Sequence, residues 1–186
     1  SDAGTAIAGS VSGTSISFGS ASVFQSGTVT GGHGATYDAT AQKVVIGYRH
    51  SSQGKAIVVD VNDTTLTYGT AVTFTTNNPL DISLAYDSTA GKNVLVFRDI
   101  TETDGKVVVG TVTASDNSIS FGAVQTFKDN AVDDPRVIYD SASNNVVILY
   151  EDTSGTTKLS FLTATLSGTT LTFGSSIDIV SEDASE

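Results

Sequence analysis

The sequence predicts an all-β protein, a β-propeller-like repeat of four-stranded antiparallel blades, with about three and a half units of 50 to 53 residues. One observation is a motif that occurs four times, as SISFG, TLTYG, SISFG and TLTFG, with its aromatic residue at Phe18, Tyr68, Phe121 and Phe173. The other is the composition, because 18 glycines with many Ser, Thr and Val favour strands and tight turns. No segment shows the hydrophobic period of about 3.6 residues that is typical of a helix.

The repeated motif begins the second strand of a predicted hairpin. In each unit an apolar segment is followed by small turn residues and then by the motif, which is the pattern of a β-hairpin. These hairpins are expected at 5–24, 55–74, 106–127 and 158–179. The glycine that ends the motif, Gly19 in the first copy, is expected to mark a bend or bulge.

A second hairpin alternates with the first and is expected at 35–48, 82–97 and 137–150. Its first strand ends in the same dipeptide each time: Tyr37-Asp38, Tyr86-Asp87 and Tyr139-Asp140. An aspartate at this position can cap the turn through its own side chain. We therefore assign these aspartates a structural role in preference to metal or ligand contact.

Together the hairpins predict one repeat domain over 1–186. It comprises a half unit at 5–24, complete units at 35–74, 82–127 and 137–179, and an acidic C-terminal tail at 180–186. Stacking of the blades is expected to bury alternate apolar residues of their second and third strands. In the second strands these residues are Val44, Ile46, Val94, Val96, Val146 and Ile148. A β-solenoid and a β-sandwich are the alternative folds.

The half unit at 5–24 has no Tyr-Asp hairpin before it. Three explanations stay open: the chain is part of a longer array, the ring closes with a thin blade, or another chain supplies the missing strands. Because unpaired edge strands are templates for pairing, self-association through such an edge is a predicted interaction.

Composition and charge exclude several classes of function. The net charge of −11 argues against nucleic acid as a partner, because affinity for phosphates comes from clustered Lys and Arg. The chain has no Cys and two His, so zinc sites built on Cys are excluded and a His-rich site is not expected. No apolar run is long enough to span a membrane. No cofactor is expected, although Ca²⁺ remains possible because its ligands are oxygen atoms.

Ligand recognition is expected on the loops that join one hairpin to the next, because they vary between units whereas the turns within hairpins are short and uniform. These loops are predicted at 25–34, 75–81 and 128–136, and at 49–54, 98–105 and 151–157. In a propeller both sets emerge on one face. The candidate ligand-binding residues on them are Arg49, His50, Asn77, Asn78, Asp81, Arg98, Asp99, Asp133, Asp134, Glu151 and Asp152. The sequence does not identify a metal site.

No catalytic set is predicted, and we expect that the protein is not an enzyme. The adjacent pairs Asp133-Asp134 and Glu151-Asp152 are typical of solvated loops, and neither His33 nor His50 lies in a nucleophile motif. Other carboxylate pairs suit a glycosidase, but nothing in the sequence determines their separation.

The strand order and the repeated motif resemble those of sialidase-type propellers. Those proteins carry an Asp-box, Ser-x-Asp-x-Gly-x-Thr-Trp, in the turn before the motif, whereas residues 12–18 lack its Asp and Trp. Sialidases also hold a carboxylate with three arginines, and this chain has Arg49, Arg98 and Arg136 but no identifiable Tyr-Glu nucleophile pair. The resemblance thus implies the blades and not the activity.

The sequence is more closely similar to repeats of the form GTVSGTSISFGS…YDSxxxKVVIAYRD in tail-fibre-like proteins of marine and cyanobacterial phages. The matching segments are 9–20, 37–50, 86–99, 110–122 and 139–152, which together extend over nearly the whole chain. The resemblance implies a virion appendage or a surface-exposed adhesive protein without enzymatic activity.

From the loops and this resemblance we expect a virion or extracellular binding module that recognises a host cell-surface glycan or receptor. The alternative is an assembly subunit, such as a virion decoration protein or an extracellular filament, joined by strand sharing. A glycan-active hydrolase is the third and least favoured hypothesis.

Overall fold

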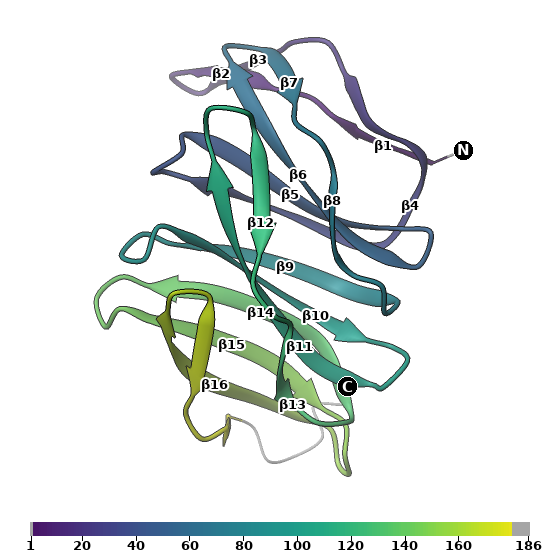
Figure 1. Ribbon diagram of the computed structural model, residues 1–186, viewed down its shortest axis with the longest axis vertical. Helices are drawn as coiled ribbons and strands as arrows, with labels where there is room; N and C mark the ends of the chain where they lie inside the picture. The colour runs from purple at the N-terminus through teal and green to yellow at the C-terminus, as the bar shows by residue number, and fades with distance from the viewer. Residues whose placement is uncertain (1, 180–186) are drawn as a thin grey trace.

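The computed structural model describes residues 2–179, which form 18 strands and no helix (Figure 1). The half-blade contains β1 (Ala3–Ala6), β2 (Gly9–Ser12), β3 (Ser15–Phe18) and the first residues of β4 (Ser22–Asp38). Blade 1 contains the rest of β4, β5 (Lys43–His50), β6 (Gln53–Asn62), β7 (Thr65–Tyr68) and β8 (Val72–Thr75). Blade 2 contains β9 (Pro79–Asp87), β10 (Lys92–Asp99), β11 (Asp104–Thr113), β12 (Ser118–Phe121) and β13 (Gln125–Lys128). Blade 3 contains β14 (Val132–Asp140), β15 (Asn145–Asp152), β16 (Lys158–Ser167), β17 (Thr170–Phe173) and β18 (Ile177–Asp178).

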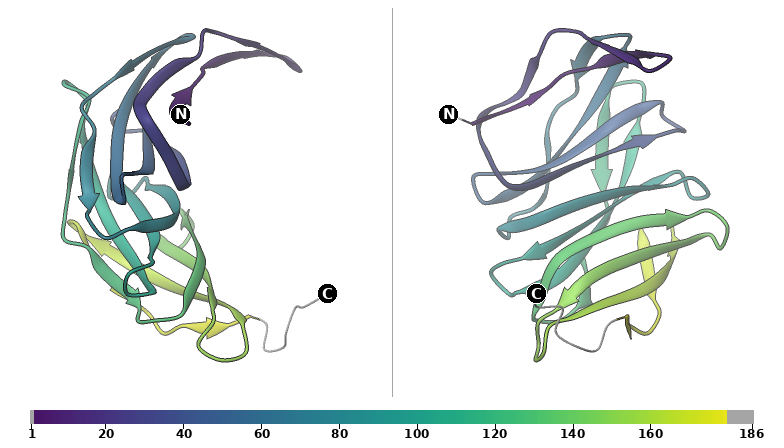
Figure 2. Two further views of the ribbon diagram at one scale, coloured as in Figure 1. Left: turned by 90° about the vertical axis from the view of Figure 1, so that its right-hand side faces the viewer. Right: turned by 180° about the vertical axis from the view of Figure 1, so that it is seen from behind.

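The blades are antiparallel sheets that stack face to face along an open crescent (Figure 2). Within each blade the spatial order of the strands follows the sequence order. The first strands of neighbouring blades, β4, β9 and β14, pack closely together, while the last strands lie farther apart. The sheets therefore fan out from their first strands, which confirms the predicted all-β, propeller-like arrangement. The predicted acidic tail at 180–186 lies outside the described residues.

The last strand of each blade is broken at the glycine that ends the repeated motif. Where another blade follows, the glycine at this bend contacts the hairpin turn of that blade. A Cβ atom on Gly19 would lie 2.6 Å from Thr64, and one on Gly122 would lie 2.5 Å from Oγ1 of Thr169. The bend was expected, but three and a half units of four strands would give fourteen strands, and the described chain has 18. Three last strands are divided at this glycine, and the first apolar segment is divided into β1 and β2.

The aspartate before each first-hairpin turn caps it, as predicted. Oδ1 of Asp38 accepts a hydrogen bond from the Ala41 amide at 2.9 Å, and Oδ1 of Asp87 accepts from the Ala90 amide at 2.8 Å. Asp140 accepts in the same way from the Ala142 amide at 3.0 Å. Because these bonds are local, the turn chemistry is readable from the sequence.

The neighbouring tyrosines join one blade to the next. The Tyr86 hydroxyl lies 2.5 Å from Oγ1 of Thr40 in blade 1, and the Tyr139 hydroxyl donates to Oγ1 of Thr89 in blade 2 at 2.6 Å. The equivalent Tyr37 has no preceding hairpin beside it in the described chain, and 56% of its surface is exposed.

The core consists of three apolar layers, one at each blade-to-blade contact. Val94, Val96 and Ile148 are completely buried, as predicted. Val44 and Ile46, however, are only partly buried. They face the half-blade, and because it lacks the first two strands of a blade it covers them incompletely. The described residues include no helix that is long and apolar enough to cross a membrane.

Candidate functional site

Many residues that were assigned to variable loops lie instead in the first strand of each blade. The connections predicted at 25–34, 75–81 and 128–136 are largely extended, because β4, β9 and β14 begin much earlier than expected. The first of them does not exist as a loop, since β4 runs without interruption from the half-blade into blade 1. The prediction of long loops at these three places was therefore wrong.

A bulge at the same position of each first strand explains the error. The bulged residue has left-handed backbone geometry in all three blades, with φ of 99° at Gly32, 52° at Asp81 and 44° at Asp134. A bulge breaks the alternation of side chains that identifies a strand in a sequence. A left-handed φ is conformationally unfavourable for aspartate, so two of the three blades have a strained acidic residue at this position.

The bulges bring the first strands into close contact. A Cβ atom on Gly32 would lie 2.9 Å from the backbone nitrogen of Asp81, and one on Gly34 would lie 3.0 Å from the carbonyl oxygen of Ile82. One blade further on, the Val137 amide donates a hydrogen bond to Oγ of Ser83 at 3.2 Å. The contacts leave a hollow, the inner groove, of about 330 Å³. It is lined by Gly32, His33, Gly34, Ala35, Asp81, Ile82, Ser83, Leu84 and Arg136.

The inner groove contains a free carboxylate, and two ion pairs lie close enough to affect its charge. No side chain among residues 2–179 forms a hydrogen bond or an ion pair with the carboxylate of Asp81. Nearby, Arg98 Nη1 lies 2.7 Å from Oδ1 of Asp133, and Arg136 pairs with Asp134. Burial raises the pKa of Asp81, and the charges of Asp134 and Asp133 raise it further against the opposing effect of Arg136 and Arg98. A hydrogen-bond donor entering the groove would relieve this unfavourable environment of the carboxylate.

Several other predicted site residues stabilise the loops themselves. Asp99 is buried and accepts hydrogen bonds from the Thr101 amide at 2.9 Å and from Nδ2 of Asn77 at 2.8 Å. The carbonyl oxygen of Asn78 accepts a further bond from the Ile100 amide at 3.3 Å. These bonds show that the two predicted sets of connecting loops lie side by side. They also occupy both carboxylate oxygens of Asp99, so this residue has a structural role in the connection.

The remaining predicted residues do not converge on one site. Nδ1 of His50 lies 3.1 Å from the carbonyl oxygen of Thr28, and Nη1 of Arg49 lies 3.5 Å from Oγ1 of Thr30. Glu151 is exposed at the end of β15. Of the predicted set, the structure thus gathers Asp81, Arg98, Asp133 and Asp134 around the inner groove. It adds His33, Ser83 and Arg136, which were not in the predicted set. Ser83 and Arg136 occupy equivalent positions in successive blades, and this equivalence was the signal in the sequence that could have placed them together.

Asp152 forms an ion pair with Lys128 at 2.9 Å, and Oδ1 accepts a bond from the Ser154 amide at 3.0 Å. Burial would raise the pKa of Asp152, but hydrogen bonds from Ser154 and Lys128 outweigh burial and lower it to about 2. A lowered carboxylate pKa adds stability that is present above the ordinary value and is lost as the pH falls towards 2. Asp152→Asn should therefore cost about 1 kcal/mol of unfolding free energy at pH 7 and progressively less as the pH falls from 4 to 2.

Urea unfolding followed across that pH range measures the effect. Glu151→Gln is the matched control, because this exposed neighbour forms no ion pair in the described chain, and its unfolding free energy should change little at any pH. An unfolding free energy for Asp152→Asn that differs from the parent by the same amount at every pH would contradict the ion-pair explanation.

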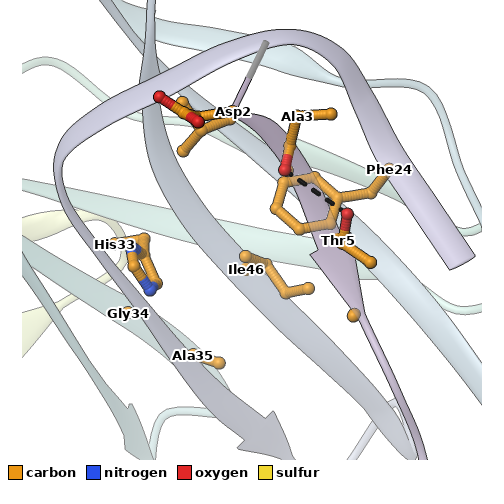
Figure 3. Close-up of a pocket in the computed structure, with 11 residues that line it drawn as sticks. Asp2, Ala3, Thr5, Phe24, His33, Gly34, Ala35 and Ile46 are labelled. Carbon is orange, nitrogen blue, oxygen red and sulfur yellow. Dashed lines mark hydrogen bonds between the residues drawn. The ribbon is translucent and has the colours of Figure 1, made fainter. Parts of the chain in front are cut away.

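A second hollow, of about 500 Å³, lies beside β1 at the N-terminal end of the crescent (Figure 3). Its walls are mainly apolar and include Phe24, Val29, Ala35 and Ile46, with His33 at one side. The hollow occurs where a complete blade would place its first two strands beside β1. The hollow therefore results from the two strands that the half-blade lacks, and it does not lie between the predicted loops.

The described residues contain no group of three or more His, Asp or Glu side chains that could hold a metal ion. Residues 2–179 therefore offer the possible Ca²⁺ no cluster of three carboxylates. No family model matches the sequence, and neither a curated protein nor a solved structure is significantly similar to it.

Proposed function

We propose that this chain is a non-enzymatic binding module of a virion or cell surface and that its inner groove binds a segment of a host surface glycan. The observation that supports this is the groove itself, where first strands from three blades bring an unpaired carboxylate, a hydroxyl, an imidazole and a guanidinium together. Its volume of about 330 Å³ is within the range of small-molecule sites.

The chemistry of the groove suits sugar hydroxyl groups. Asp81 offers acceptor oxygens, Arg136 offers only donors, and Ser83 and His33 can each do both. A sugar hydroxyl donates one hydrogen bond and accepts others, so it can satisfy neighbouring groups of both kinds. Donation to Asp81 would also relieve the burial and charge repulsion that raise its pKa.

The ion pairs of two arginines argue against a sialidase-type site. Arg98 pairs with Asp133 and Arg136 pairs with Asp134, so neither is free to hold a substrate carboxylate as sialidase arginines do. The strained bulges position the groove on strands and not on loops, which favours a rigid recognition surface.

The test is the binding of the protein to a printed panel of bacterial surface polysaccharides, with isothermal titration of any that bind. Asp81→Asn should weaken binding about tenfold or more, because a hydrogen bond to a charged group contributes about 1.5–3 kcal/mol. Asp129→Asn, at an exposed aspartate of the connection before β14, is the matched control and should bind like the parent. Binding that Asp81→Asn leaves unchanged would refute the groove as the site.

Assembly by strand sharing is a second candidate, and the hollow beside β1 favours it. β1 pairs with β4 along one edge, while its other edge borders an apolar hollow with room for further chain. Ala35→Asp, at an exposed position on the hollow's wall, should then abolish self-association without unfolding the blades. Light scattering measures this, and unchanged association would exclude strand sharing at this place.

A further inference from the structure

The contacts between blades inside the chain repeat one interface, and both halves of that interface are exposed at the ends of the crescent. One half, the front face, belongs to the half-blade and contains Ile7, Val11, Ile16 and Phe18. The other half, the rear face, belongs to blade 3 and contains Ile138, Val147, Leu149 and Phe161.

The front face has the same side-chain types that the complete blades bury against the blade before them. In blade 2 the residues equivalent to Ile16 and Phe18 are Ile119 and Phe121, which pack in the apolar layer shared with blade 1. Ile119 is 3% exposed there, whereas Ile16 is 54% exposed in the half-blade. The front face therefore has the composition of an interface but nothing packed on it.

The rear face is equivalent to the side of blade 2 that packs against blade 3. There, Ala85, Val96 and Val107 are buried at 8% exposure or less. Their equivalents in blade 3 are larger apolar residues, and one of them, Ile138, is 62% exposed. Solvated end units of repeat arrays usually have polar outer faces. On this side of blade 3, β14 presents the polar residues Asp134 and Arg136 as well as Ile138, so the apolar part of the rear face is the strip that Ile138 forms with Val147, Leu149 and Phe161.

The glycine bends supply a second, independent sign. Gly69 lies so close to the hairpin turn of the next blade that a Cβ atom added to Gly69 would overlap the backbone oxygen of Asn117. Gly174 occupies the same place in blade 3, yet its nearest neighbours belong to Thr163 of its own blade, at 3.3 Å. At the other end of the crescent, Thr14 of the equivalent turn around Gly13 is exposed, whereas Thr64 and Thr169, which lie against Gly19 and Gly122, are partly buried. One end thus presents an uncovered bend and the other an uncovered turn.

From these two matches we infer that a second copy of this chain stacks head to tail, its front face on this copy's rear face and its Gly13 turn against Gly174. The inference gives the chain a mode of assembly other than strand sharing, and it does not depend on glycan binding. The crescent is curved, and two copies bring six complete blades and two half-blades, eight positions in all. Propellers close with about four to eight blades, so the expected product is a closed dimer.

Light scattering of the intact chain, with variants on each face, tests this inference. Val11→Asp removes an apolar contact from the front face, and Ile138→Asp removes one from the rear face; both residues are well exposed, at 73% and 62%, so the fold should survive. Each variant alone should dimerise about tenfold or more weakly than the parent. Val124→Asp, at an apolar residue 41% exposed outside both faces, is the matched control and should dimerise like the parent.

Mixing the two variants distinguishes head-to-tail stacking from other modes. In a closed pair of one variant with the other, one of the two contacts joins an intact front face to an intact rear face, and the other contact carries both substitutions. Each variant alone has a substituted residue in both contacts. Where one aspartate is enough to break a contact, the mixture should therefore associate more strongly than either variant alone, although more weakly than the parent. A parent that is monomeric at all concentrations, or a front-face or rear-face variant that dimerises as strongly as the parent, would overturn the inference. If Ala35→Asp alone abolishes dimers, the copies associate by strand sharing and not by stacking of the front and rear faces. If monomeric variants still bind glycan, glycan binding in the inner groove does not require the dimer.

Discussion

Replacing Phe97 by alanine is expected to lower the unfolding free energy by about 3–5 kcal/mol. Phe97 of β10 is completely buried, and its ring centroid lies 5.4 Å from that of Phe74 in the preceding blade. The substitution would remove an aromatic pair and leave a cavity in the layer that joins blades 1 and 2. Urea unfolding followed by far-UV circular dichroism measures the loss, with the slope of the transition checked for constancy.

Phe18→Ala is the matched control, because it deletes the same side chain where 61% of it is exposed. It should lower the unfolding free energy of a monomer by well under 1 kcal/mol, since little apolar surface leaves a packed environment. This comparison should be made in the Val11→Asp background, so that loss of dimers does not contribute. Equal losses for the two phenylalanines would contradict face-to-face stacking of blades 1 and 2.

Gly69→Ala is expected to destabilise the protein by about 2–3 kcal/mol. The added Cβ would meet the backbone oxygen of Asn117 well inside the 3.0 Å below which real Cβ contacts essentially never fall. A backbone atom in a hairpin turn cannot rotate away as a flexible side chain can, so blades 1 and 2 would have to separate locally. Thermal unfolding, monitored by circular dichroism, should show the melting temperature falling by several degrees.

Gly155→Ala separates this steric effect from the general effect of replacing a glycine. Gly155 has nothing within 4 Å of the new Cβ and does not have a left-handed φ. Its replacement should change the unfolding free energy by less than about 1 kcal/mol, with stabilisation expected because the unfolded chain loses freedom. A melting temperature for Gly69→Ala as high as that for Gly155→Ala would show that the bend is not a contact between blades.

The sequence by itself determined the features that depend on neighbouring residues. The motif around Phe18, Tyr68, Phe121 and Phe173 predicted the hairpins and the bend after them, because turn residues and alternation act over a few positions. The caps formed by Asp38, Asp87 and Asp140 were predictable for the same reason. The repeat spacing then indicated that several such sheets must stack to bury their faces.

Only the tertiary structure decided which polar residues meet and which surfaces stay open. Asp81 and Arg136 lie 55 positions apart and share the inner groove because bulges pull the first strands of successive blades together. Asp99 was predicted to lie in a ligand-binding loop, but it is buried and accepts a hydrogen bond from Asn77 in the neighbouring connection. Ile16 is exposed and Ile119 is buried, although both lie in the same local sequence, SISFG. The two residues differ only in whether another blade packs on them, which the local sequence does not encode. Local chemistry specifies strands and turns, whereas contacts between distant segments specify burial and convergence.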